Sequence, residues 1–281
     1  MQTQSSKPEN ISSQKLINDD ATAKRLRAVI LKMIHAGKSG HPGGSFSCLE
    51  IIMTLFGDIL RFDAKNPEWD ERDRFILSKG HGVPALYAVL AECGFFPKDW
   101  LLTLRQLGSP LQGHPDRLRI PATEAATGSL GQGLSIAQGM AMAGKMDKKD
   151  FRVYCVMGDG EIQEGQVWEA AMSAPKFKLD NLTAIIDFNH GQIDGTSDEV
   201  MSLDPLADKW KAFNWNVVEV QGHDRKELRK ILPTRVSGKP TLVIAHTIKG
   251  KGISFMEKII DWHGVAPNDE QLAKALKELE S

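Results

Sequence analysis

A glycine-flanked aspartate stands directly after a largely apolar segment. Residues 151–157 predict a strand, and Gly158-Asp159-Gly160 follows at once, with Glu161 next. Flanking glycines let a backbone come close to a ligand, and a helix that begins after such a turn offers unpaired N–H groups to an anion. Most such tripeptides are simple turns, so this motif alone does not establish a binding site.

A second candidate ligand, Asn189, follows the next predicted strand, residues 182–187, thirty positions after Asp159. The carboxyl ends of successive parallel strands lie on the same edge of a sheet, so the two side chains can converge. A carboxylate, an amide oxygen, a backbone carbonyl and diphosphate oxygens form the all-oxygen shell that Mg²⁺ prefers. The pair therefore predicts a metal-diphosphate site.

Four histidines stand in glycine-rich, loop-like segments, namely His41, His81, His114 and His263. Imidazole can donate or accept a proton near neutral pH, which suits acid–base chemistry. A single histidine in such a loop is usually a solvated loop residue. Of the others, His35 is expected on a helix surface or in helix packing, and His223 and His246 are expected to be structural.

The elements that must position these residues are strands alternating with helices. Five predicted strands cover residues 74–77, 151–157, 182–187, 216–220 and 241–245. Predicted helices cover residues 22–36, 48–60, 84–93, 134–145, 164–174, 206–213, 225–232 and 269–280, and the glycine- and proline-rich residues 38–44 predict a loop. This order predicts one doubly wound α/β domain, a mostly parallel sheet with helices on both faces, over residues 21–281.

Composition narrows the function classes. The chain has 281 residues and a net charge of −1, which gives no reason to expect a nucleic acid partner. No apolar run reaches the length that spans a membrane, and the polar residues 1–20 predict a flexible arm rather than a secretory leader. The three scattered cysteines indicate neither disulfides nor zinc, and Cys155 is expected to be a buried, inert thiol. A reducing cytoplasm fits best.

Six further motifs resemble the transketolase family of thiamine diphosphate-dependent enzymes. Gly158-Asp159-Gly160 followed by Asn189 is similar to the cofactor motif that such enzymes share. The other motifs, in the family's order, are Ser39-Gly40-His41-Pro42-Gly43, Ser78-Lys79-Gly80-His81-Gly82, Gly113-His114-Pro115, Gly128-Ser129-Leu130-Gly131-Gln132-Gly133, the run from Asp187 through Gly195, and Trp262-His263-Gly264. The resemblance covers nearly the whole chain but only the first half of a full-length transketolase.

The resemblance implies thiamine diphosphate and Mg²⁺, or another divalent cation such as Ca²⁺ or Mn²⁺, as cofactors. It implies that Asp159, the Asn189 side chain and the Gly191 carbonyl bind the metal. The implied cofactor-binding residues are His81, Gly128, Ser129, Leu130, Gly158, Asp159, Gly160, Glu161, Asn189 and His263. The four histidines are implied to surround the thiazolium and the donor sugar and to move protons there.

Other positions carry open alternatives. By resemblance, Glu164 lies near the contact between catalytic halves, where it links two active sites. Glu169 either lies at the same contact or is a solvated residue of the helix. Lys249 and Lys251 either attract a sugar phosphate or decorate a mobile loop. His190 departs from the family, which has a small residue there, and it either contacts the cofactor or points outward.

The family's second domain supplies the glutamate that activates the cofactor and the pocket for its pyrimidine, and no segment here resembles that domain. The resemblance therefore implies a split transketolase that needs a second chain, in an assembly with two copies of each. The implied reaction moves a two-carbon ketol unit from a ketose phosphate to an aldose. Two alternatives remain: a transketolase-like enzyme for a branched or sulfonated ketose, and a non-catalytic protein that only binds the cofactor.

Overall fold

The computed structural model describes residues 19–280. The arm expected over residues 1–20 lies outside the described residues except for its last two. Asp19 caps the first helix, because its side chain accepts a hydrogen bond of 2.6 Å from the Thr22 N–H. None of the helices in the described part of the chain combines the length and apolar character needed to cross a membrane.

Five parallel strands form one sheet in the order β1-β2-β3-β5-β4. Their bounds are β1 Arg74–Leu77, β2 Val153–Gly158, β3 Leu182–Phe188, β4 Asn216–Gln221 and β5 Thr241–His246. These strands lie where the sequence predicts them, with ends that differ by at most two residues. The doubly wound α/β prediction is confirmed.

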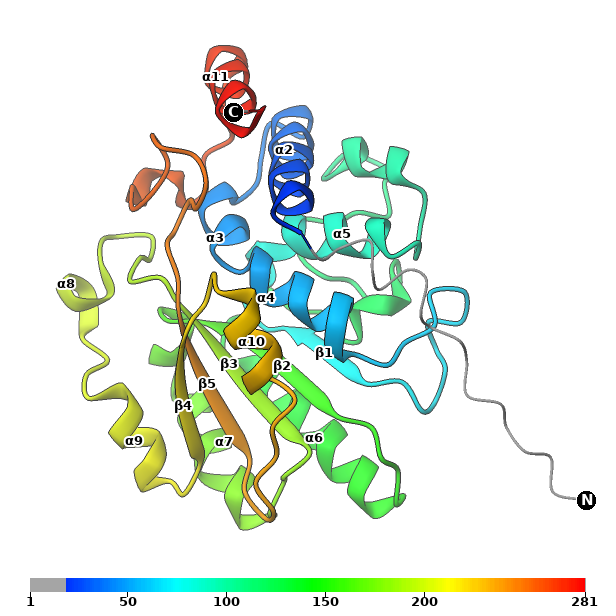
Figure 1. Cartoon of the computed structure of the whole chain (residues 1–281), viewed down its shortest axis with the longest axis vertical. Helices are drawn as coiled ribbons and strands as arrows, with labels where there is room; N and C mark the ends of the chain where they lie inside the picture. Colours follow the sequence, from blue (N-terminus) through cyan, green and yellow to red (C-terminus); the bar gives the residue numbers. More distant parts are fainter. Residues whose placement is uncertain (1–18, 281) are drawn as a thin grey trace, which may run out of the picture.

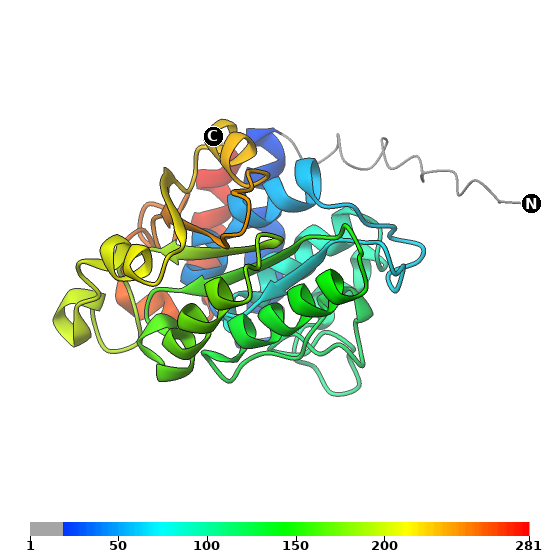
Figure 2. The same cartoon turned by 90° about the horizontal axis from the view of Figure 1, so that it is seen from below.

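Helices cover both faces of the sheet (Figures 1 and 2). The hydrophobic core on one face takes side chains from α2 Asp20–Ala36, α4 Leu49–Thr54, α5 Val83–Glu92, α10 Arg225–Ile231 and α11 Asp269–Glu280, of which α11 packs on α2. The other packs on α6 Gln132–Met146, α7 Gly165–Lys176 and α9 Leu206–Ala212. Side chains alternate along a strand, so Tyr154 and Val156 enter the first core while Cys155 enters the second. Cys155 is buried, as expected.

The segment after α2 departs from the prediction. Residues 38–44 are predicted as a loop, but helix α3 begins at its proline and spans Pro42–Ser47. Proline suits a first helical position, where its missing N–H would have no partner. Gly43 serves close packing rather than turning, because a Cβ there would lie 2.8 Å from the Trp262 carbonyl oxygen. The helix predicted over residues 48–60 also divides, into α4 and a π-helical segment at Leu55–Ile59.

The short helix α8, Ser197–Met201, is absent from the sequence-based prediction. Thr196 and Glu199 form a capping box at its start, in which each side chain accepts a hydrogen bond from the other's backbone N–H. This signal is local and can be read in the sequence. The helix follows the loop after β3 and returns Ser197 toward the sheet edge, where it contacts Asp159.

Strand register brings the chemistry-bearing loops together. Gly158 in β2 pairs with Asp187 in β3, and Phe188 pairs with His246 in β5. Asp159, Asn189 and Thr247 therefore each follow a strand at nearly the same level. This carboxyl edge of the sheet is the place where open parallel sheets bind ligands.

Candidate active site

A cavity of about 410 Å³ opens at the carboxyl edge of the sheet. We call it the carboxyl-edge site. Every site residue predicted from the sequence lines it except Ser129, namely His41, His81, His114, Gly128, Leu130, Gly158, Asp159, Gly160, Glu161, Glu164, Asn189, Gly191 and His263. Ser129 is exposed and is not part of the cavity lining. Loops that are far apart in sequence thus form one site.

Hydrogen bonds from neighbouring groups hold the side chains of both Asp159 and Asn189. The Asp159 carboxylate accepts from the Gly160 N–H at 3.0 Å and from the Ser197 hydroxyl at 3.1 Å. Burial and the nearby Asp187 raise the pKa of Asp159. The Asn189 amide oxygen accepts from the Gly191 N–H at 3.1 Å. A carboxylate whose pKa is raised in this way gains from a cation placed beside it.

Next to Asn189, whose side-chain amide donates to Asp187 at 3.2 Å, lies a buried ion pair between Lys79 and Asp187. Asp187 also accepts hydrogen bonds from the Ser47 and Thr247 hydroxyls. Burial tends to raise the pKa of Asp187, but the Lys79 charge and the hydrogen bonds from Lys79, Ser47 and Thr247 together outweigh burial and hold this pKa below the usual range. A buried pair of this kind is stable only when its remaining hydrogen bonds are made, and here they are. Of the pair, Lys79 lines the cavity and Asp187 does not.

Lys249, for which the sequence leaves two interpretations open, lines the site. Only 2 % of the residue is exposed. Its Nζ donates to the Gly191 carbonyl at 3.0 Å and lies 2.8 Å from His263 Nδ1. Burial, followed by the Lys79 charge, lowers the pKa of Lys249 to about 8. Decoration of a mobile loop is therefore the wrong interpretation for Lys249. Lys251 is half-buried and pairs with Glu257 at 3.3 Å.

Three of the predicted histidines form a cluster. The ring centroids of His41 and His81 are 5.3 Å apart, those of His41 and His263 are 5.5 Å apart, and those of His81 and His263 are 5.2 Å apart. Burial and neighbouring lysine and arginine charges lower the pKa of His41 to about 4 and that of His263 to about 3, and they lower that of His81 as well. All three rings are therefore neutral at pH 7.

His114 lies at the exposed rim, and burial lowers its pKa to a smaller extent. It packs against Gly128, whose φ is 136° and where a Cβ would lie 2.9 Å from His114 Cγ. Only glycine fits such a position. The close approach fixes the position of the Gly128-Ser129-Leu130 turn against the histidine.

The two predicted glutamates differ. Glu161 is buried, and its carboxylate accepts from the Ser78 hydroxyl, from the Gly131 N–H at 2.9 Å and from the Gly158 N–H at 3.1 Å. Those bonds tie three site loops together. Glu164 is exposed at the start of α7, as is Glu169 one turn later.

His190 adopts a φ of 61°, a conformation that favours glycine. Its ring lies 4.2 Å from that of Phe188, it is exposed, and it is not among the cavity residues. Of the remaining histidines, His35 contacts Asp269 and His246 contacts Glu219, both at 2.8 Å at the surface.

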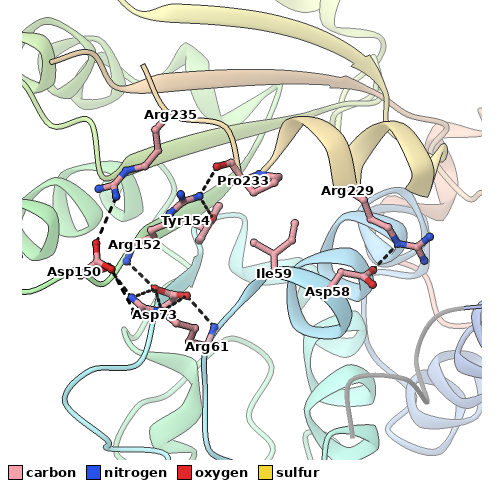
Figure 3. Close-up of a pocket in the computed structure, with 10 residues that line it drawn as sticks. All are labelled: Asp58, Ile59, Arg61, Asp73, Asp150, Arg152, Tyr154, Arg229, Pro233 and Arg235. Carbon is pink, nitrogen blue, oxygen red and sulfur yellow. Dashed lines mark hydrogen bonds and ion pairs between the residues drawn. The ribbon is translucent and has the colours of Figure 1, made fainter. Parts of the chain in front are cut away.

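A second cleft, of about 580 Å³, lies at the opposite end of the sheet, where β1 and β2 begin (Figure 3). We call it the amino-edge cleft. It contains the arginines Arg61, Arg152, Arg229 and Arg235 and the aspartates Asp58, Asp73 and Asp150. Arg61 pairs with Asp73 at 3.0 Å and Arg229 with Asp58 at 2.8 Å. Three of the four arginines thus pair with aspartates of the cleft, and Arg152 donates to the Pro233 carbonyl.

Comparison with known proteins decides the family. The family described as "Transketolase, thiamine diphosphate binding domain" matches residues 18–280. The chain belongs to this family. It is 45% identical over 259 residues to an apulose-4-phosphate transketolase subunit of Phocaeicola vulgatus, a match that covers 92% of each chain. It is 44% identical over 270 residues to the 6-deoxy-6-sulfo-D-fructose transketolase subunit SqwG of a Clostridium species, covering 95% of this chain and 98% of that one.

Solved structures agree with the family assignment. Transketolase from Leishmania mexicana matches with a TM-score of 0.85 and 31% sequence identity. That match covers 96% of this chain but 41% of the other. The chain thus spans the subunit-length relatives and less than half of this longer transketolase. The transketolase resemblance inferred from the motifs is confirmed.

The carboxyl-edge site fits the family's cofactor. Two buried polar atoms, His41 Nδ1 and Gln192 Nε2, have no hydrogen-bond partner among the described residues. Both residues line the cavity. Buried polar groups are nearly always paired, so unpaired ones on residues that line a cavity are suited to a polar ligand. A Cβ on Gly160 would lie 3.1 Å from Gln192 Cβ, which shows how closely the backbone borders that space.

The cavity residues that sequence reasoning misses or leaves open include Lys79, Lys249 and Gln192. A signal exists for Lys249, since the next residue is Gly250, which adopts a φ of 77° that favours glycine. Nothing in the local sequence indicates that Lys79 meets Asp187, because 108 positions separate them.

Proposed function

We propose that this chain is the diphosphate-binding subunit of a two-chain transketolase, which transfers a two-carbon ketol unit from a ketose phosphate to an aldose. The observation that carries the proposal is the meeting of Asp159 and Asn189 with three neutral histidines around one cavity. Similarity over nearly the full length of relatives that are themselves named as transketolase subunits supports the two-chain form.

Asp159, the Asn189 amide oxygen and the Gly191 carbonyl are the proposed ligands of Mg²⁺, with Ca²⁺ or Mn²⁺ as substitutes. These are hard oxygen donors of the kind that such cations select. The Lys249 ammonium and the Gly160 N–H, which here donates to Asp159, are proposed to face the diphosphate. Lys249 is suited to this because an anion would offset the burial of its charge.

When bound, thiamine diphosphate supplies the carbon nucleophile that adds to the donor carbonyl. The histidines of the chain are proposed to hydrogen-bond the surrounding oxygens and to transfer protons. A neutral imidazole can donate from one nitrogen and accept at the other, whereas an imidazolium can only donate. The lowered pKa values of His41, His81 and His263 thus keep both roles available at neutral pH. His114, at the rim, is proposed to contact the sugar.

The activating glutamate and the pyrimidine pocket are assigned to a second chain. Glu161 is unsuited to that role, since its carboxylate is committed to internal hydrogen bonds. Glu164 is exposed and available to a neighbouring chain. We propose an assembly with two copies of each chain, in which α7 and its Glu164 lie near the contact between halves.

The names of the relatives bear on which ketose is the donor substrate. The relatives are named for apulose 4-phosphate and for 6-deoxy-6-sulfo-D-fructose. A branched or sulfonated ketose is therefore proposed beside the pentose phosphates as substrate. A cytoplasmic location is part of the proposal, supported by three cysteines that are free and buried.

The test is ketol transfer to ribose 5-phosphate with thiamine diphosphate and Mg²⁺, for the chain alone and with a transketolase C-terminal subunit. Xylulose 5-phosphate, apulose 4-phosphate and 6-deoxy-6-sulfofructose are compared as donors. Activity only in the mixture supports the proposal. Activity of the isolated chain contradicts the partner requirement. Cofactor binding without turnover of any donor favours a non-catalytic binding role.

A further inference from the structure

The loop that carries Lys249 is held at two points by residues outside the carboxyl-edge site. On one side of Lys249, the Ile248 N–H donates to His223 Nε2 at 2.9 Å. On the other side, the Lys251 carbonyl accepts from Arg27 Nε at 2.7 Å. Because these anchors flank Lys249, they fix the backbone from which its side chain reaches Gly191 and His263.

Both anchors converge on one buried carboxylate. Glu50 is 7% exposed and lies on α4, outside the cavity lining. One of its oxygens accepts from Arg27 Nη2 at 2.6 Å, and the other lies 2.9 Å from His223 Nδ1. Since a backbone N–H can only donate, His223 Nε2 is the acceptor toward Ile248, and the ring proton sits on Nδ1 and donates to Glu50.

The charge on Glu50 is well supported in this setting. Burial tends to raise its pKa, but the hydrogen bond from His223 and the charge of Arg27 outweigh burial and hold the pKa below its ordinary value. Arg27 is itself only 6% exposed. A buried carboxylate with two oriented donors specifies the position of both donors, which is how a residue remote from a ligand can position a site.

We propose that Glu50 is a positioning residue for the carboxyl-edge site: through His223 and Arg27 it fixes the loop over residues 247–252 and so places Lys249. The importance of that placement for cofactor affinity rests on the proposed function. The placement itself does not, so the two can be tested separately.

The first test measures the placement without any cofactor. The full chain is treated briefly with an amine-acylating reagent, and labelling of each lysine is followed by peptide mass spectrometry. Buried lysines react slowly, so Lys249 is protected in the wild-type chain. The glutamine in Glu50→Gln has one acceptor oxygen, whereas Arg27 and His223 each require an acceptor, so one of the two anchors is lost. Labelling of Lys249 is then expected to rise by about tenfold or more.

Two controls separate positioning from general loosening. Lys79 is equally buried in the same site but is held by Asp187, so its labelling is expected to stay at the wild-type rate in Glu50→Gln. Asp73→Asn removes a comparable buried carboxylate at the amino-edge cleft and is expected to leave Lys249 protected (Figure 3). Unchanged labelling of Lys249 in Glu50→Gln, or an equal rise at Lys79, overturns the proposal.

His223 provides a second pair of variants that keeps the proposal testable if Glu50→Gln does not fold. His223→Gln can place an amide oxygen near the former Nε2 position and still accept from the Ile248 N–H. His223→Ala cannot. Labelling of Lys249 is therefore expected to rise more in His223→Ala than in His223→Gln. Equal labelling in the two variants, at the wild-type rate, contradicts the anchoring role.

The second test connects placement to cofactor affinity by calorimetric titration of thiamine diphosphate with Mg²⁺. Glu50→Gln is expected to weaken binding by about tenfold, and by less than about twofold when Lys249→Met is already present, because coupled residues are not additive. Equal weakening in both backgrounds overturns action through Lys249. If the wild-type chain and its assembled complex bind no cofactor, the proposed function fails while the labelling result still decides the role of Glu50.

Discussion

Buried polar groups are paired to different extents at the two ends of the sheet. At the amino-edge cleft, the Asp73 carboxylate accepts hydrogen bonds of 2.8 Å from the backbone N–H of Arg61 and from that of Arg152. It also pairs with the Arg61 guanidinium (Figure 3). At the carboxyl-edge site, three histidines are grouped with lowered pKa values. Among the described residues there, two buried polar atoms have no partner.

This difference separates a contribution to fold stability, at the amino-edge cleft, from a capacity to bind a ligand, at the carboxyl-edge site. Buried groups that satisfy one another stabilise the fold and leave little for a ligand to gain. Buried groups that are oriented but unsatisfied reduce stability, and that reduction is recovered when a ligand binds. Substitutions at the two ends should therefore separate stability from binding.

The largest expected effect comes from Asp159→Asn. Loss of a metal-binding carboxylate should lower ketol transfer by the assembled enzyme by about a thousandfold or more, in line with the loss of a central electrostatic contact. The folded chain should be at least as stable, since burial and Asp187 raise the pKa of Asp159 and disfavour its charge. Activity assays and urea unfolding check both parts. A large loss of stability would show that Asp159 is structural.

Asp73→Asn should have the opposite pattern. It breaks a buried charge pair and a hydrogen bond to backbone, so the free energy of unfolding should fall by about 1–3 kcal/mol. Cofactor affinity of the folded fraction should not change, because Asp73 lies at the other end of the sheet. Urea unfolding and calorimetric titration measure the two quantities. Weakened cofactor binding would remove the proposed distinction between the ends.

The histidine cluster predicts a pH dependence of stability. In the unfolded chain these histidines titrate near pH 6.5, whereas burial lowers the pKa of His41 to about 4 in the folded chain. Between those values the unfolded chain binds more protons, so the free energy of unfolding falls as pH falls. Each histidine contributes at most about 1.4 kcal/mol per pH unit, and less where water screens it.

Urea unfolding at pH 7, 6 and 5 tests this dependence, with His41→Gln as the comparison. The variant should show a shallower slope, because one of the groups that takes up a proton on unfolding is gone. The amino-edge cleft has no histidine among its lining residues, so Asp73→Asn should keep the wild-type slope in this range. An unchanged slope in His41→Gln would show that the ring is not buried as a neutral group.

Glu164→Gln should have the smallest effect on the chain itself. The residue is exposed at the start of α7, so the free energy of unfolding should change by less than about 0.5 kcal/mol. If Glu164 lies at a contact between chains, analytical ultracentrifugation of the assembled enzyme should show weaker association. Unchanged association together with unchanged activity would assign Glu164 to the solvated helix surface.

Local patterns in the sequence are sufficient for the sheet and for the first ligands of the site. Apolar runs predict all five strands, and the parallel order places Asp159 and Asn189 on one edge. Where local composition misleads, the cause is packing. The glycines after His41 indicate a loop, but Gly43 lies in helix α3, where it allows close contact with the Trp262 backbone.

The sequence by itself determined the strand order along the chain, the turn that carries Asp159 and the glycine-rich settings of the histidines, because each depends on neighbours within a few positions. Tertiary structure alone decided that Lys249 is buried, that Lys79 meets Asp187, and that Glu50 joins Arg27 to His223. Those contacts join residues that are 23 to 173 positions apart, and which groups meet over such separations depends on how the helices pack on the sheet.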